Sequence, residues 1–154
     1  MNRLVFLLVV VCAAGFVLSD AEDVSAKIRI VDSISDFKLA NPDVQLMKLD
    51  SQSVRAGKTI HYSLGGRVAG DRLVGTSRGS HSWAFPQNIQ LSLNYPTNGG
   101  SGAVVTYVSI HVNQTSNQGR GYVLNGGIGQ RFISIIIEAN NTLNFSYNAE
   151  IYGV

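Results

Sequence analysis

The glycine-rich stretch YVLNGGIGQRFISIII, residues 122–137, decides between two kinds of fold. Three glycines fall within the four positions 126–129, and a run rich in isoleucine follows. A dinucleotide-binding fingerprint needs G-x-G-x-x-G between a strand and a helix, because the helix N-terminus holds the pyrophosphate. Gly127 and Gly129 supply the first two glycines, but the third is missing, and β-branched residues follow. The stretch is therefore predicted to be the tight turn of a β-hairpin and not a phosphate loop.

Apolar and polar residues alternate in the segments around this turn. In NIQLSLNY, residues 88–95, every second side chain from Ile89 to Tyr95 is apolar or aromatic. Such a period of two predicts strands with one buried face and one wet face. RFISIII, residues 131–137, lacks the alternation and is expected to be covered on both faces. The remaining strand candidates are TIHYSL (59–64), TYVSIHVN (106–113) and LNFSYNAEIY (143–152).

Clusters of glycine, asparagine and proline separate these strand candidates. Examples are LGGRVAGD at residues 64–71, YPTNGGSG at 95–102 and EANNT at 138–142. Glycine and asparagine accept positive φ angles at little cost, so such clusters favour tight turns. No segment has a helical period of ten or more residues. The sequence therefore predicts an all-β fold, a single antiparallel β-sandwich or barrel-like domain, after a cleaved signal peptide.

The first residues have the layout of a secretory signal peptide. Arg3 precedes an apolar run from Leu4 to Leu18, and small and acidic residues follow. A membrane span needs about 20 apolar residues, so a cleaved signal over residues 1–19 is predicted, with cleavage after Ser19 or Ala21. No later run reaches transmembrane length. The only cysteine, Cys12, lies inside this signal. We expect a secreted, extracellular protein.

Two regions of different character follow the signal. Residues 20–56 carry an excess of acids and few glycines, and they are predicted to form an N-terminal extension. Within it, AKIRIVDSI (26–34) is a candidate short strand, and DVQLMKLDSQSV (43–54) is a candidate helix turn or strand. Residues 57–154 are predicted to form the all-β domain.

The motifs that carry catalytic chemistry are incomplete. GGRVAGDR (65–72) nearly spaces a phosphate-binding P-loop, but Asp71 stands where a lysine is required. We expect a turn there, with an ion pair between Asp71 and Arg72. The acids of the domain, Asp71, Glu138 and Glu150, are too few and scattered for a paired-carboxylate mechanism. No G-x-S-x-G nucleophile motif occurs. The sequence predicts that the protein is not an enzyme and has no catalytic residues or cofactor.

The three histidines do not have the spacing of a metal site. His61, His81 and His111 lie 20 and 30 residues apart, and the domain has no cysteine to assist them. His61 and His111 both fall on predicted polar strand faces. We expect exposed histidines and no metal.

An uneven charge distribution suggests a candidate binding surface. Residues 55–131 carry seven basic residues and one acid, which would attract an anionic glycan, lipid head group or nucleic acid. The alternative is a solvated rim of single charges. Trp83, with Phe85 and Tyr95, is a candidate loop aromatic, and the alternative for it is core packing. The candidate surface consists of Arg67, Arg72, Arg78, Arg120, Arg131 and Trp83.

Three N-glycosylation sequons lie in turns or on wet strand faces. They begin at Asn113, Asn140 and Asn144, and each fits N-x-[ST] without proline. Behind a signal peptide they predict a secreted glycoprotein. Asn140 and Asn144 are close enough to compete for occupancy.

Several of these blocks together resemble an insect family called multiprotein bridging factor 2, whose members are also described as probable salivary secreted peptides. The resemblance covers residues 59–154. Asn113 stands where the family usually has an aspartate, and GGIGQ replaces the commoner GGPGQ. The blocks that carry the resemblance are GDRL (70–73), IHVNQ (110–114), GY (121–122), GGIGQ (126–130) and IYG (151–153).

The resemblance implies two different functions. The family name describes a nuclear co-activator that bridges a DNA-bound regulator to the general transcription machinery. Many members nonetheless carry signal peptides, as this chain does. We expect a secreted, non-enzymatic binding protein whose partner is an unknown protein or anionic ligand. The alternative is a transcription co-activator that acts by protein–protein bridging, because no direct DNA-binding motif is present.

Overall fold

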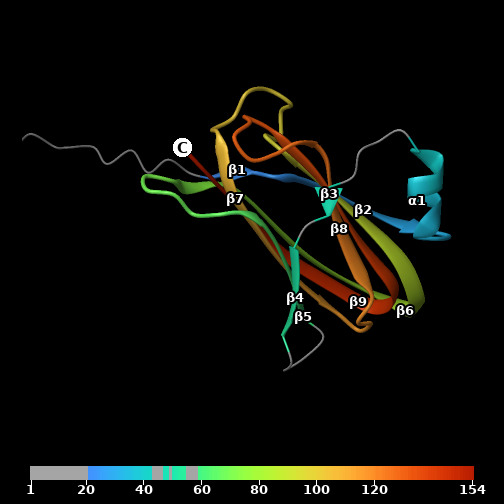
Figure 1. The fold of residues 1–154 in the computed structure, drawn as a ribbon. Coiled ribbons are helices and arrows are strands. Elements are labelled where there is room, and N and C mark those ends of the chain that lie inside the picture. Colours follow the sequence, from blue (N-terminus) through green and yellow to red (C-terminus); the bar gives the residue numbers. More distant parts are fainter. Residues whose placement is uncertain (1–20, 43–46, 49, 55–58) are drawn as a thin grey trace, which may run out of the picture.

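The computed structural model describes residues 21–42, 47–48, 50–54 and 59–154 (Figure 1). The predicted signal peptide lies outside the described residues. Within these ranges the chain forms nine strands and one short helix. The elements are β1 (Glu22–Asp23), β2 (Ser25–Val31), α1 (Ser35–Ala40), β3 (Met47–Lys48), β4 (Asp50–Val54), β5 (Thr59–Gly65), β6 (Arg72–Tyr95), β7 (Val105–Gln114), β8 (Gly119–Gly126) and β9 (Ile133–Gly153).

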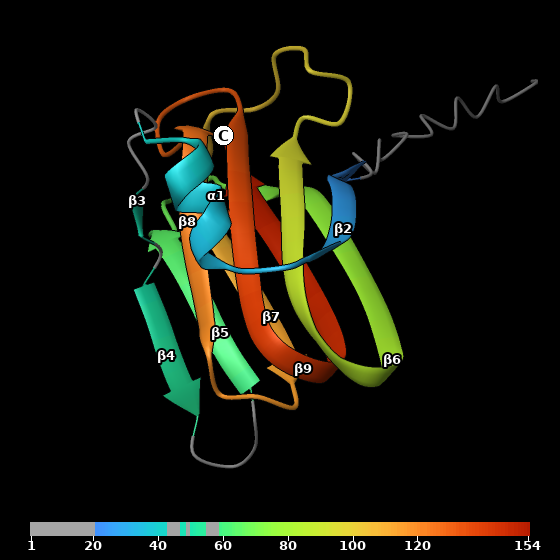
Figure 2. The same cartoon turned by 90° about the vertical axis from the view of Figure 1, so that its right-hand side faces the viewer.

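Two long strands, β6 and β9, run through the whole molecule. They have 24 and 21 residues and pair antiparallel along almost their full lengths. The register shifts between Ser82 and Gln87, where only Gln87 and Thr142 still pair. Figure 2 shows both strands curving back on themselves at this point, which we call the bend. A register shift of this kind strengthens local twist and lets a strand change direction.

The bend folds one hydrogen-bonded sheet into two layers. Layer A contains β2, the second half of β6, the first half of β9, β8 and β3. Layer B contains β1, the first half of β6, the second half of β9, β7, β5 and β4. The layers face each other closely: a methyl group on Gly75 of layer B would lie 2.9 Å from the Tyr95 ring of layer A. The predicted all-β antiparallel fold is confirmed. Both layers belong to one continuous hydrogen-bonded sheet.

The space between the layers is filled by the residues that alternation places inside. Every inward residue from Ile89 to Tyr95 is buried, and so are Val108, Ile110 and Val112 of β7. Phe145 and Ile151 fill the middle from the second half of β9. Removing a buried phenylalanine side chain typically costs about 3–5 kcal/mol, so this core holds the layers together.

The first half of β9 is covered on both faces, as the isoleucine run predicts. Ile135 points into the core, and Ile136 on the opposite face is also buried. Helix α1 lies over this outer face of layer A (Figure 2). The segment before it is strand β2, so the candidate strand at residues 26–34 is confirmed for residues 26–31 and ends three residues earlier than predicted. The strands at Met47–Lys48 and Asp50–Val54 favour the strand alternative for residues 43–54.

The glycine-rich stretch forms the connection of a β8–β9 hairpin, as predicted. Gly126, Gly127 and Gly129 all adopt positive φ angles. The loop also docks on layer B, because the Gly129 N–H donates to the Val105 carbonyl at 2.8 Å. A β-carbon on Gly126 would overlap the carbonyl oxygen of Phe132, whereas one on Gly129 would meet open space. Gly126 is therefore required both for its φ angle and for its lack of a side chain.

The two glycines give a matched pair of variants. Gly129→Ala should lower the free energy of unfolding by roughly 1–2 kcal/mol, the cost of a left-handed alanine. Gly126→Ala should cost about 1–3 kcal/mol more, because its methyl group must displace the backbone of Phe132. Urea denaturation of both variants measures the difference. Equal losses would contradict the close approach at Gly126.

Candidate functional site

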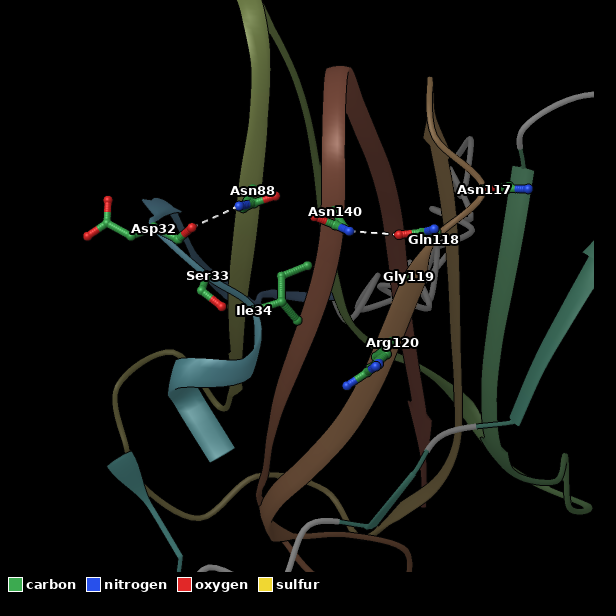
Figure 3. A pocket seen from close by; sticks show the side chains of 9 residues that line it. All are labelled: Asp32, Ser33, Ile34, Asn88, Asn117, Gln118, Gly119, Arg120 and Asn140. Carbon is green, nitrogen blue, oxygen red and sulfur yellow. Dashed lines mark hydrogen bonds between the residues drawn. The ribbon is translucent and has the colours of Figure 1, made fainter. Parts of the chain in front are cut away.

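A polar groove of about 570 Å³ lies on layer A beside the bend (Figure 3). Its walls come from four places in the chain: the segment between β2 and α1, strand β6, the β7–β8 connection with the start of β8, and strand β9. The lining is rich in side-chain amides, with one arginine and one aspartate. The lining residues are Asp32, Ser33, Ile34, Asn88, Asn117, Gln118, Gly119, Arg120 and Asn140.

Asn88 fixes one wall of the groove. Its Nδ2 donates to the carbonyl oxygen of Asp32 at 3.0 Å, and its Oδ1 accepts from the N–H of Asn141 at 3.0 Å. Asn88 is the first residue along β6 that pairs with β2, opposite Val31, the last residue of β2. One amide therefore ties the segment before α1 to the bend of β9.

Gln118 and Asn140 fix the opposite wall. Asn140 Nδ2 donates to Gln118 Oε1 at 2.7 Å, and the Asn140 N–H donates to the Gln118 carbonyl at 3.1 Å (Figure 3). Gln114 Nε2 donates to the same carbonyl at 2.9 Å. These hydrogen bonds tie the β7–β8 connection to β9 and to the end of β7, and they orient the amides of the groove.

Arg120 stands over a buried carboxylate at the edge of the groove. Its register partner on β9 is Glu138, whose side chain is turned outward but only 2% of the residue is exposed. Burial raises the pKa of Glu138, while a hydrogen bond from Gln90 and the charge of Arg120 oppose that shift. Arg120 itself is exposed and lines the groove.

The groove offers hydrogen bonding from several directions. A primary amide has two N–H donors and an oxygen with two lone pairs, so each amide keeps capacity beyond the bonds described. A guanidinium adds donors in a fork that matches carboxylate, sulfate or phosphate oxygens. The arrangement suits a polar ligand with hydroxyl or anionic oxygens.

The predicted surface residues are spread over the molecule, and of them only Arg120 lines this groove. Arg78 is exposed on layer B, where its register partner is Asn148. Arg131 Nη1 donates to the Gly102 carbonyl at 3.0 Å in the loop beyond β8. Trp83 is half-buried against the core and stacks with His81, while Phe85 nearby is 75% exposed. A shared function of these arginines and Trp83 stays a prediction.

Asp71 pairs with Arg67, so the predicted ion pair with Arg72 is wrong. The turn before β6 folds back, with the Asp71 N–H donating to the Val68 carbonyl, and this brings Arg67 within 2.7 Å of the carboxylate. The Asp71 side chain is only 2% exposed and also accepts from Thr106 at 3.0 Å. Adjacent side chains of an extended chain point to opposite sides, which separates Arg72 from Asp71.

The Asp71 contacts have an electrostatic consequence. The hydrogen bond from Arg67 is the main cause that lowers the pKa of Asp71 to about 2, with further lowering by the Val68 N–H and Thr106 and opposition from burial. Arg67 in turn lies over the Tyr152 ring, 3.8 Å from its centroid. This cluster joins the β5–β6 connection to Tyr152 near the end of β9 and to Thr106 of β7.

Two of the three sequon asparagines are exposed near the bend. Asn113 and Asn144 lie on layer B and line one hollow of about 540 Å³ there. Asn140 is half-buried and lines the amide groove itself. Their modification stays a prediction.

His81 and His111 are exposed, as predicted, whereas His61 is half-buried because the strand register places it beside His111. His61 and His111 are directly opposite on β5 and β7, and their rings stack. No group of three or more His, Cys, Asp or Glu side chains gathers anywhere in the described ranges. The same part of the chain contains no helix with the length and apolar character that a membrane crossing requires.

Sequence reasoning found only part of the groove. It singled out Arg120 for charge and Asn140 for modification, but it missed Asn88, Gln118 and Asp32. The available signal was the density of asparagine and glutamine in the turns around the bend. Only the pairing of β6 with β9 shows that these turns meet.

The fold is an all-β sheet of two layers with a polar groove on layer A. Comparison with family models agrees with the blocks described above: the family "Transcription activator MBF2" matches residues 64–153. The chain belongs to this family. Comparisons with curated proteins and with solved structures give no match.

The Asp71 cluster predicts a specific acid response. The folded-state pKa of about 2 lies below the ordinary value of 3.8, so the ionised form stabilises the fold fully above about pH 4. That contribution is lost as the pH falls toward 2. Asp71→Asn should therefore lower the melting temperature at pH 5, and the gap to the native chain should narrow by pH 2. Thermal unfolding across this range measures it.

Two arginine variants test which arginine forms the ion pair with Asp71. Arg67→Gln should weaken the acid dependence, and Arg72→Gln should leave it unchanged. A gap that stays constant from pH 5 to pH 2 would mean that the charge of Asp71 does not stabilise the fold.

Proposed function

We propose that the mature chain is a secreted, non-enzymatic binding protein and that the amide-lined groove is its ligand site. The observation that supports this most is the convergence of Asn88, Gln118 and Asn140 from separate segments on one hollow. Hydrogen bonds within the chain orient these three side chains. Preorganised polar groups lose less conformational entropy on binding, so such a groove suits recognition.

The N-terminal residues and the sequons support export. Residues 1–19 have the composition of a cleaved signal. Asn113 and Asn144 are exposed in the folded chain, so glycans attached to them would extend into solvent without disturbing the core. Glycans at these two positions would surround the bend on layer B and leave the amide groove open on layer A.

The ligand is proposed to carry anionic oxygens beside hydroxyl groups. Arg120 supplies an exposed positive charge in the lining of the groove, and the amides supply donors and acceptors beside it. Charge-assisted hydrogen bonds from a guanidinium are stronger than neutral ones, so an anionic group would anchor the ligand.

The family description favours a second candidate function, transcription co-activation by protein bridging. Under that proposal the chain meets a DNA-bound regulator through protein contacts, and it must remain in the cell. The two proposals differ first in location.

Location is tested with the full chain carrying a C-terminal tag in insect cells. We expect the protein in the medium, without residues 1–19, and with a mass that falls after treatment with a glycosidase that removes N-linked glycans. Asn113→Gln and Asn144→Gln should each remove part of that mass. Recovery of unglycosylated protein in nuclei, with the signal intact or bypassed, would favour the co-activator function instead.

The groove is tested with defined probes. A short heparin fragment should bind the purified chain more tightly than neutral dextran of the same length, and Arg120→Ala and Gln118→Ala should each weaken heparin binding severalfold. Arg78→Ala removes an equal charge from layer B and should leave binding unchanged. Equal losses for Arg78→Ala and Arg120→Ala would show diffuse attraction to the whole surface, and no binding at all would remove anionic glycans as the ligand class.

A further inference from the structure

One of the three predicted glycosylation sites belongs to the amide groove itself. Asn140 is half-buried and lines the groove, whereas Asn113 and Asn144 are exposed on layer B. Asn140 Nδ2 donates to Gln118 Oε1 at 2.7 Å (Figure 3). N-glycosylation attaches a bulky oligosaccharide to this side-chain nitrogen. A glycan on Asn140 would therefore begin inside the groove, and glycans on the other two asparagines would not.

The neighbours of Asn140 are the residues that the proposed ligand would contact. Gln118 accepts from the Asn140 side chain and, through its carbonyl oxygen, from the Asn140 N–H at 3.1 Å. Arg120 lines the same groove two residues further along β8. The groove measures about 570 Å³, which is the size of a site for one small ligand. The first sugars of a glycan on Asn140 and a separate ligand would compete for this space.

The third residue of this sequon is enclosed in the folded chain. Thr142 is 0% exposed, and its hydroxyl donates to the Asn144 carbonyl at 2.6 Å and accepts from the Thr115 N–H at 3.1 Å. The hydroxyl residue is part of the N-x-[ST] signal that directs glycosylation. The folded chain therefore hides this signal, and a glycan must reach Asn140 before Thr142 is enclosed.

We propose that Asn140 divides the folded protein into two forms, an unmodified form with an open groove and a glycosylated form with a filled groove. The proposal rests on the proposed function, which takes the groove as the ligand site and export as the route to glycosylation. The sugar donor is a lipid-linked oligosaccharide. The bond from its first sugar carbon to the lipid diphosphate breaks, a bond from that carbon to Nδ2 forms, and Nδ2 loses one hydrogen as a proton. The lipid diphosphate is the leaving group.

The two forms do not interconvert once the chain has folded. Glycosylation at Asn140 is closed to the unmodified form, because Thr142 is buried and its hydroxyl is held by two hydrogen bonds. The proportion of the two forms is then set before folding is complete. The binding capacity of a preparation should equal the fraction that carries no glycan at Asn140.

The experiment uses the full chain with Asn113→Gln and Asn144→Gln, expressed in insect cells, so that Asn140 is the remaining sequon asparagine. We expect two secreted species that differ by the mass of one glycan and separate on a lectin column. The unmodified species should bind the short heparin fragment. The glycosylated species should bind it roughly tenfold more weakly, because the ligand loses contacts with Gln118 and Arg120. The same variant made in bacterial cytosol carries no N-glycan and should match the unmodified species.

A second readout without any ligand separates this proposal from the proposed function. Phenylglyoxal reacts with accessible arginine side chains, and mass spectrometry locates the product. Arg120 should react severalfold more slowly in the glycosylated species than in the unmodified one. Arg78, exposed on layer B, is the internal control and should react equally in both. Shielding of Arg120 when neither species binds heparin would support the filled groove and remove anionic glycans as the ligand class.

Four results would overturn the proposal. They are an Asn140 that carries no glycan, a glycosylated species that circular dichroism shows to be unfolded, heparin binding of equal strength in both species, and equal reactivity of Arg120 in both.

Discussion

The continuous pairing of β6 with β9 is the constraint on which the rest of the structure depends. Both strands take part in both layers, so every other strand is attached to one of them directly or through a neighbour. The shift of register between Ser82 and Gln87 lets the ribbon fold without being cut. The two layers are therefore joined by continuous strands and by hydrogen bonds. The apolar core lies between the two halves of the folded β6–β9 pair.

Local patterns in the sequence were enough to predict the strands but not their partners. The alternation in NIQLSLNY and TYVSIHVN identifies the buried face of β6 and β7 because a period of two is a local property. The turn at residues 126–130 is equally local, since its glycines are adjacent. The stacking of His61 on His111 and the meeting of Asn88 with Asp32 depend on register between distant strands, which no local pattern contains. The same limit explains the wrong partner for Asp71, whose contact with Thr106 arises from the fold of the sheet.

Three of the five blocks shared with the family, GDRL, GGIGQ and IYG, lie at the end of the molecule away from the bend, whereas IHVNQ extends toward the bend. Gly129 docks on Val105, Arg67 covers Tyr152, and Asp71 binds Thr106. These contacts join the β8–β9 connection to β7 and the β5–β6 connection to β7 and β9, which closes one end of the sandwich. The amide groove lies at the other end of β8, and none of its lining residues belongs to those blocks.

The position of β9 in the order of strands also determines when the sheet can form during synthesis of the chain. It is the last strand along the chain, yet it is the central strand of both layers. Residues 72–126 cannot bury their apolar faces until residues 133–153 have been synthesised, and almost all pairings then join distant parts of the chain, a topology that folds slowly. Thr142, which is buried in the finished structure, can therefore be enclosed only after this last strand has paired.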